Sequence, residues 1–271
     1  MQPLISVVIP VWNGEKSLEC CLRSVMAQSV KDLEIIVVDD GSTDGTWALM
    51  ERLAAEDDRI RPVHRENGGV SEARNTALPL CRGEFIRFAD ADDELPPDSM
   101  ALLLERARRA GSDLTIAPYV EVMGPVRNVR NLAKRSDSIP TDEYLAFLNR
   151  WSNSFYAGVL WNKLFRRELI EKGGVRFQKG LCWGEDFAFV CDYLRYAQTV
   201  AFLDEPVYIY NRNPQGVTVC FALNCILHPL RNSRMKGELY GHLRGLYEHR
   251  GVYPAYRRTL WMYLFRFTVN N

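Results

Sequence analysis

Three carboxylates, Asp90, Asp92 and Asp93, follow a strand-like apolar run in the segment GEFIRFADADDELPPD, and the chain then turns at Pro96 and Pro97. Like charges this close together disfavour joint ionisation unless a cation lies between them. Ligand sets made only of oxygen favour a hard divalent ion, Mg²⁺ or Mn²⁺, over zinc. The segment therefore predicts a divalent metal site.

Polar residues also follow three other strand-like runs. The first run leads to Asn13, the second ends in Asp39 and Asp40, and the third leads to Asn67 and Gly69. In open α/β sheets, ligands bind in the crevice beyond the carboxyl ends of the strands. A turn followed by a helix cap explains DGSTDG equally well when that segment is taken alone. The convergence of these polar ends with the carboxylate cluster nevertheless indicates a ligand site.

The elements that must position these residues alternate in type along the chain. Strand patterns cover residues 5–11, 33–40, 59–65 and 84–90, and helical patterns cover 17–27, 46–55 and 71–80. The nearly continuous Ile and Val of the second run indicate a strand buried on both faces, as in a parallel sheet. We predict an α/β fold with a mixed, mainly parallel sheet flanked by helices.

The second half of the chain is less regular. The segment GSDLTIAPYVEV, from Gly111, predicts a fifth strand, and the polar, basic GPVRNVRNLAKRSDSIP predicts a mobile loop. Residues 111–182 are expected to hold the variable region that determines specificity. The tail from Cys220 carries arginines beside aromatic residues, namely Arg257, Arg258 and Arg266 beside Trp261, Phe265 and Phe267. Three interpretations of this tail stay open, namely a helix packed on the main domain, a homodimer face, or a helix at a membrane surface.

Composition excludes several classes of protein. The 271 residues contain 34 Lys and Arg and 34 Asp and Glu, so no overall field favours nucleic acid. Seven cysteines, an odd number without a CxxC pair, favour a reducing cytoplasm over a disulfide framework. The N-terminus predicts a core strand rather than a signal peptide, and no apolar stretch approaches the ~20 residues of a membrane span. The four histidines lack metal-binding spacing.

Six motifs together resemble the family 2 glycosyltransferases, which have a GT-A nucleotide-sugar-binding fold. They are VVIPVWNGEKSLECCLRSVMAQ, EIIVVDDGSTDGT, ENGGVSEARNTAL, GEFIRFADADDELPPD, WNKLFRRELI and GEDFAF. The resemblance spans residues 4 to 215. It implies a GT-A-like (Rossmann-like) catalytic domain over 1–215, with a donor half over 1–110 and an acceptor half over 111–215. A C-terminal helical extension would occupy 216–271.

The resemblance also implies which residues bind a nucleotide diphosphate sugar. Those expected to bind the donor are Pro10, Val11, Trp12, Asn13, Asp40, Asn67, Gly69, Arg74, Asp90, Ala91 and Asp92. Pro10, Val11 and Trp12 would line the base pocket, and Asp40 would accept the ring N–H of a uracil. Asp39 stays an alternative, because adjacent strand residues face opposite ways. Asp92 would hold the divalent cation, with Asp90 near the ribose or a metal-bound water. For Arg74, an exposed helical arginine is the alternative to a diphosphate contact.

In the same family pattern, Asp186 of GEDFAF is the general base for inversion at the anomeric carbon. The acceptor-side candidates are Trp183, Glu185, Asn162 and Lys163. If the resemblance is set aside, Glu185 and Asp186 are explained as favourable charges in the first turn of a helix over 187–196. Likewise, WNKLFRREL is explained equally well by amphipathic packing.

The leading hypothesis is a metal-assisted, inverting glycosyltransferase of the hexosyl type that uses a UDP-sugar in bacterial surface polysaccharide or glycan synthesis. Its acceptor would be a glycan or a lipid-linked glycan, and its location the cytoplasm or the inner face of the cell membrane. The alternatives are a sugar-nucleotide binding protein without turnover and a nucleotidyltransferase. Gly216 stands where the family usually has a serine, which leaves closure of a C-terminal loop over the donor in question.

Overall fold

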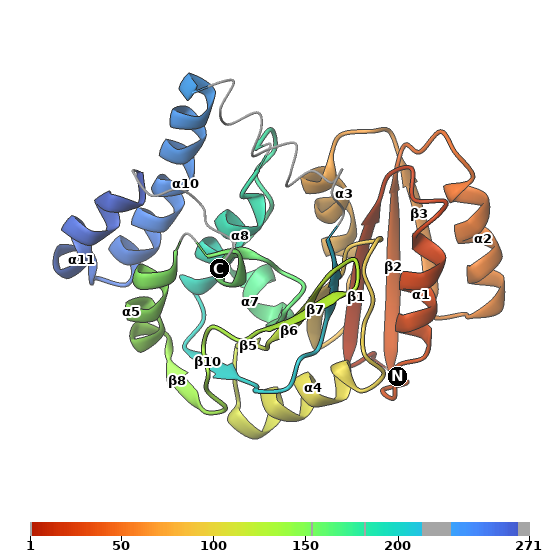
Figure 1. Cartoon of the computed structure of the whole chain (residues 1–271), viewed down its shortest axis with the longest axis horizontal. Helices are drawn as coiled ribbons and strands as arrows, with labels where there is room; N and C mark the ends of the chain where they lie inside the picture. Colours follow the sequence, from red (N-terminus) through yellow and green to blue (C-terminus); the bar gives the residue numbers. More distant parts are fainter. Residues whose placement is uncertain (1, 153, 182, 213–228, 265–271) are drawn as a thin grey trace.

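The computed structural model describes residues 2–152, 154–181, 183–212 and 229–264 (Figure 1). Two predictions fall outside the described residues. They concern closure of the C-terminal loop at Gly216 and the part of the tail that contains Phe265, Arg266 and Phe267.

A mixed sheet forms the centre of the fold. In the described part of the chain it has eight strands in the order β3-β2-β1-β4-β9-β5-β10-β8. These are β1 (Ile5–Val11), β2 (Leu33–Asp40), β3 (Ile60–Arg65), β4 (Phe85–Phe88), β5 (Leu114–Ile116), β8 (Ser138–Pro140), β9 (Lys163–Arg166) and β10 (Thr199–Phe202). Strands β1 to β4 are parallel, whereas β9 runs antiparallel to β4 and β5. The predicted mainly parallel α/β fold is confirmed.

Strands β1, β2 and β4 form the core because helices cover the sheet, whereas β3 is only partly buried. Every residue of β1 and β2 is buried. The connecting helices are α1 (Leu18–Met26), α2 (Thr46–Glu56), α3 (Val70–Ala77) with the short η1 (Leu78–Leu80), and α4 (Ser99–Ala110). In α1 the buried residues Leu18, Cys21, Leu22 and Val25 recur at helical spacing and face the sheet. All four strands and three helices predicted for residues 5–90 are present.

A second, three-stranded sheet extends one prediction and corrects another. It has the order β11-β6-β7, from β11 (Ile209–Asn211), β6 (Tyr119–Met123) and β7 (Val126–Arg130). The fifth strand predicted at the start of the segment from Gly111 is present as β5, and the same segment continues past Pro118, which has no N–H for a ladder, into β6 of the second sheet. The loop predicted from Gly124 is wrong where β7 and β8 form. Strand β7 is exposed on both faces, so its sequence shows no apolar alternation.

The remaining helices are α5 (Thr141–Trp151), α6 (Phe155–Gly158), α7 (Arg167–Lys172), α8 (Glu185–Leu194), α10 (Pro229–His249), α11 (Tyr253–Trp261) and η2 (Met262–Leu264). Helices α5, α10 and α11 lie at the opposite end of the molecule from α2, and α7 and α8 lie nearer its middle (Figure 1). Helix α10 lies against α8, and its Leu239, Leu243 and Leu246 are fully buried. The described tail is thus packed on the body of the protein, while Trp261 stays 54% exposed.

The helices in the described ranges do not resemble membrane spans. Each of them is too short or too polar to cross a bilayer.

Candidate active site

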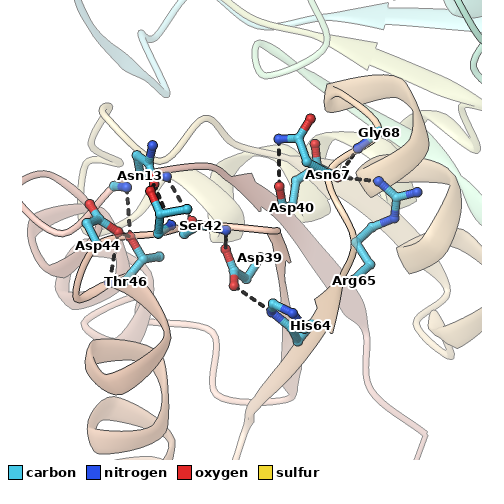
Figure 2. Close-up of polar contacts among 12 residues, drawn as sticks. Asn13, Asp39, Asp40, Ser42, Asp44, Thr46, His64, Arg65, Asn67 and Gly68 are labelled. Atoms are coloured by element: carbon cyan, nitrogen blue, oxygen red, sulfur yellow. Dashed lines mark hydrogen bonds and ion pairs between the residues drawn. The ribbon is translucent and has the colours of Figure 1, made fainter.

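At the carboxyl end of the sheet, the loop after β1 is hydrogen-bonded to the loop after β2 (Figure 2). The backbone N–H of Asn13 donates to Ser42 Oγ at 2.8 Å, and the Asn13 side-chain oxygen accepts the Thr43 N–H at 2.8 Å. These bonds hold Asn13 at a φ of 50°, which is uncommon for a residue other than glycine. Pro10 and Val11 are buried at the end of β1, and Trp12 next to this turn is 61% exposed. Of the predicted base pocket, Trp12 therefore offers a ring surface to a ligand.

The adjacent carboxylates at the end of β2 point in opposite directions, as Figure 2 shows. Asp39 is fully buried, accepts the Ser42 N–H at 3.0 Å, and lies 2.8 Å from His64 Nδ1. The Asp40 carboxylate accepts a hydrogen bond from the guanidinium of Arg65. It also accepts the backbone N–H of Gly68 at 3.1 Å and that of Gly69 at 2.7 Å. Its Oδ2 retains acceptor capacity. The prediction that Asp40 reads a base stands as a prediction, and the structure adds that Asp40 anchors the turn before α3.

Asn67 and Gly69 shape that turn. The Asn67 side-chain amide donates to the Asp40 carbonyl oxygen at 2.8 Å. Gly69 has a φ of 91°, in the region that favours glycine, and a side chain there would meet no atom within 4 Å. The turn therefore leaves open space directly in front of the N-terminus of α3.

Tyr208, just before β11, and Asn211, in β11, help to hold the acidic loop after β4. The Tyr208 hydroxyl accepts the Asp90 N–H at 3.0 Å, and Asp93 Oδ1 accepts the Asn211 N–H at 2.7 Å. The Asn211 amide donates to the Asp92 carbonyl oxygen at 3.2 Å. Sequence reasoning missed Tyr208 and Asn211, because nothing in the aromatic run VYIYN signals a contact more than a hundred residues away.

Asp93 is the most deeply buried carboxylate of this loop. It is 1% exposed, and its Oδ2 has no hydrogen-bond partner among the described residues. Burial, and then repulsion by Asp90 and Asp92, raises its pKa well above the usual range. The pKa of Asp92 is also raised, first by desolvation of its carboxylate within the loop and then by Asp90. Both shifts show that the loop concentrates negative charge without enough compensation.

A divalent cation would balance this excess of negative charge. Among the described residues, no three His, Cys, Asp or Glu side chains are grouped to hold a metal. An ion such as Mg²⁺ usually takes only one or two protein carboxylates and completes its shell with water and substrate phosphates. Asp92, exposed at the loop, and Asp90, with 34% of its side chain exposed, are the carboxylates available for that purpose.

Arg74 joins the acidic loop to the predicted base. Its side chain is 4% exposed, with Nη2 3.1 Å from Asp90 Oδ1 and Nη1 2.6 Å from Asp186 Oδ1. Nη1 also lies 3.4 Å from Glu185 Oε1. Burial alone would lower the pKa of Arg74, but the three carboxylates more than offset this effect and raise it. The alternative of an exposed helical arginine is wrong.

Asp186 lies in the first turn of α8, which begins at Glu185, two residues earlier than predicted. Burial raises the pKa of Asp186 to about 7; Arg74 opposes this shift, and Glu185 and Asp90 reinforce it. A carboxyl group whose pKa is near neutrality is suited to general base catalysis.

Asn162 and Lys163 lie beneath the site and are fully buried. Lys163 Nζ donates to the carbonyl oxygens of Tyr156 and Val159, at 3.1 and 2.6 Å, and to Asn162 Oδ1 at 2.8 Å. Burial lowers the pKa of Lys163 to about 7, against the attraction of Asp186. Lys163 therefore interacts electrostatically with Asp186, and Asn162 supports Lys163; the contact of both residues with an acceptor stays a prediction. Trp183, half-buried before α8, also stays an acceptor-side prediction.

Gly184 fixes the angle at which α8 begins. Its φ is 79°, and a Cβ there would lie 2.7 Å from Leu239 Cδ1 of α10. Gly184→Ala is therefore expected to lower the stability of the protein by about 1–3 kcal/mol, because the backbone strain and the clash combine. Thermal unfolding measures the loss. Gly237→Ala is the control, since no atom lies within 4 Å of a Cβ in the middle of α10 and alanine favours the helix there. An equal or higher melting temperature for Gly184→Ala would contradict the strain.

A pocket of about 320 Å³ opens beside the acidic loop. It is lined by Asp92, Val122, Gly124, Asn211 and Arg212, so the small sheet forms one of its walls. The pocket adjoins the acidic loop at Asp92, and the same loop contacts Arg74 and, through it, the predicted base Asp186.

Comparison with known proteins decides the family. A profile described as Glycosyl transferase family 2 matches residues 6–174, more than half of the chain. The chain belongs to glycosyltransferase family 2. This confirms the resemblance and the assignment as a glycosyltransferase.

Relatives and solved structures agree with this assignment. The chain is 30% identical to the uncharacterized glycosyltransferase EpsJ of Bacillus subtilis, over 98% of this chain and 76% of the relative. It is 40% identical over 115 residues to a chondroitin synthase of Escherichia coli, which covers 42% of this chain and 16% of that protein.

Among solved structures, S. aureus TarS 1–349 in complex with UDP-GlcNAc has a TM-score of 0.71 and 22% identity, over 91% of this chain and 66% of that chain. The mannosyltransferase PcManGT from Pyrobaculum calidifontis, in complex with GDP-Man and Mn²⁺, has a TM-score of 0.62 and 19% identity, over 97% and 74%. These two likenesses support the GT-A-like fold.

Proposed function

We propose that this glycosyltransferase moves a hexose from a UDP-sugar to an acceptor hydroxyl with inversion at the anomeric carbon. The observation that carries the proposal is the position of Arg74 between Asp90 and Asp186. One guanidinium separates the predicted leaving-group end of the site from the predicted base. This arrangement supports an inverting displacement, in which the base must lie on the face of the sugar opposite the leaving group.

Each side chain has a defined part in this reaction. Asp186 accepts the proton of the acceptor hydroxyl, and Arg74 holds the Asp186 carboxylate in place. Trp12 offers a face for stacking on the base, and Asp40 a carboxylate for its N–H group. Asp92 and Asp90 would hold Mg²⁺ or Mn²⁺, which when bound supplies compensation for the charge that develops on the leaving diphosphate.

Two further features belong to the proposal. The mannosyltransferase with Mn²⁺ and the TarS complex with UDP-GlcNAc support a divalent cation and a uridine nucleotide. The chondroitin synthase relative supports a role in polysaccharide synthesis. The location of the protein, in the cytoplasm or at the inner face of the membrane, stays a prediction. The formation of a homodimer also stays a prediction. The exposed Arg257, Arg258 and Trp261 on α11 are the residues that would contact a membrane.

A panel of nucleotide sugars with Mn²⁺ tests the proposal and separates its alternatives. Release of a nucleoside diphosphate supports glycosyl transfer or donor hydrolysis. Release of pyrophosphate would support a nucleotidyltransferase, and donor binding without release would support a binding protein.

The pH dependence of kcat reports on Asp186. Since burial raises its pKa to about 7, Asp186 is protonated and inactive as a base at lower pH, so kcat is expected to fall with pH below 7. Arg74→Gln removes the cation that favours the carboxylate. The acidic limb should therefore move upward by about one pH unit or more. Arg61→Gln, an exposed change on β3, is the control. A limb that stays in place in Arg74→Gln would separate Arg74 from the base.

A further inference from the structure

The acidic loop is attached to strand β11 through its backbone. Glu94 and Ile209 form an antiparallel bridge, in which the Glu94 N–H donates to the Ile209 carbonyl oxygen at 3.2 Å and receives the Ile209 N–H on its own carbonyl oxygen at 2.9 Å. The loop is also closed by a turn, where the Asp93 N–H donates to the Asp90 carbonyl oxygen at 3.2 Å. Asp92, the predicted metal ligand, lies between the first residue of this turn and the bridge.

Asn211 is bonded to three consecutive residues of this loop. Its backbone N–H donates to Asp93 Oδ1 at 2.7 Å. Its side-chain Nδ2 donates to the Asp92 carbonyl oxygen at 3.2 Å and to Glu94 Oε1 at 3.4 Å. Asp93 is 1% exposed, so the bond to its carboxylate matters, because a buried carboxylate without hydrogen bonds is costly. One residue of β11 thus fixes the backbone at Asp92 and both side chains that follow it.

The small sheet does not need the side chain of Asn211. Strand β11 pairs with β6 through backbone groups, as in the bond from the Arg212 N–H to the Val122 carbonyl oxygen at 2.9 Å. The backbone N–H of Asn211 points away from β6, to Asp93. Both hydrogen bonds that the structure gives to the Asn211 amide nitrogen go to the acidic loop. The amide therefore supports the loop rather than the sheet.

This support leaves the carboxylate of Asp92 open to a ligand. Asp92 is exposed, and together with Asn211 it lines the pocket of about 320 Å³. Its carbonyl oxygen is bonded, whereas its carboxylate lies in the part of the loop that burial and mutual repulsion leave rich in negative charge. A metal ligand that its neighbours orient before the ion arrives binds the ion more tightly, and loss of such a neighbour typically costs about 10–100-fold in metal affinity.

We propose that Asn211 is a positioning residue for the divalent cation and holds the acidic loop in the conformation that presents the Asp92 carboxylate to the metal. This inference rests on the proposed function, because it concerns the cation invoked there. Asn211 acts through Asp92, so its loss should lower the affinity for the metal and leave the contacts of the nucleotide itself in place.

Titration of Mn²⁺ into the full chain saturated with UDP tests this role without any acceptor. Asn211→Ala removes the amide and keeps the backbone N–H, so it should weaken the binding of Mn²⁺ by about tenfold or more. The Kd for UDP measured in a chelator should stay close to that of the wild type. Asn128→Ala is the control and should bind Mn²⁺ like the wild type. Asn128 is exposed on β7 and pairs with Glu121, so it lies on the face of the small sheet opposite to Asn211.

A second variant and a double variant separate positioning from a general structural role. Asn211→Ser has a side chain too short to bond to both acceptors in the loop, and it should bind Mn²⁺ about as weakly as Asn211→Ala. In the Asp92→Ala background, Asn211→Ala should cause no further loss of UDP binding in the presence of Mn²⁺, because both changes act on the same cation. Melting temperatures without ligands, close to that of the wild type, show that the variants fold.

The possible outcomes are distinct. Wild-type affinity for Mn²⁺ in Asn211→Ala and Asn211→Ser would overturn the inference. An added loss in the double variant would also overturn it, because Asn211 would then act on UDP directly. So would an equal loss of UDP binding with and without Mn²⁺, which indicates general damage to the loop. A wild type that binds UDP with no effect of Mn²⁺ would instead overturn the proposed metal site, and this inference with it.

Discussion

Asp186→Asn is expected to lower kcat by about 10²–10⁴-fold, the range typical for loss of a general base. Asparagine keeps the size of the side chain and a polar atom toward Arg74, 2.6 Å away in the structure, but it cannot accept the acceptor's proton. Because the donor contacts lie on other residues, the Kd for UDP and Mn²⁺ should change by less than about threefold. Steady-state kinetics and calorimetric titration measure the two quantities.

Glu185→Gln is the matched control for this variant. Glu185 precedes Asp186 in α8 and also contacts Arg74, at the longer distance of 3.4 Å. Its loss should cost much less activity than the loss of Asp186. A larger loss in Glu185→Gln, or unchanged turnover in Asp186→Asn, would remove Asp186 from the role of base.

Asp92→Ala is expected to abolish the contribution of Mn²⁺ to donor binding and to reduce transfer by about a hundredfold or more, since a cation at the diphosphate is worth several kcal/mol in the transition state. The side chain is exposed, so the variant should fold normally. UDP titrations with and without Mn²⁺ should give the same Kd in the variant and different values in the wild type.

Asp98→Ala provides a control from the same loop. Asp98 is exposed before α4, and its side chain makes no capping hydrogen bond there. The Mn²⁺ dependence of this variant should match the wild type. A loss of equal size in both variants would indicate a general effect of removing negative charge rather than a metal ligand at Asp92.

The first half of the fold was predictable because its signals are local. The Ile and Val runs of β1 and β2 are buried on both faces, and their helices show regular spacing. The small sheet was not predictable in this way. Strand β7 is exposed on both faces, and β11 pairs with β6 from almost ninety residues further along the chain.

The site was predictable as a set of residue types rather than as a geometry. Motifs identified Asp90, Arg74 and Asp186, but their mutual contacts join positions up to 112 residues apart. No spacing within one segment reveals that Arg74 bonds to both carboxylates. The roles of Tyr208 and Asn211 in holding the acidic loop likewise arise only from the folded chain.

The most direct test of the account is the release of UDP from a UDP-sugar donor by the wild type in buffer treated with a chelator, followed by addition of Mn²⁺. If Asp92 and Asp90 hold a cation against the leaving diphosphate, release should be nearly absent with the chelator and restored by the metal. Restoration should fail in Asp92→Ala. Full-rate release of UDP in thoroughly chelated buffer would contradict the account.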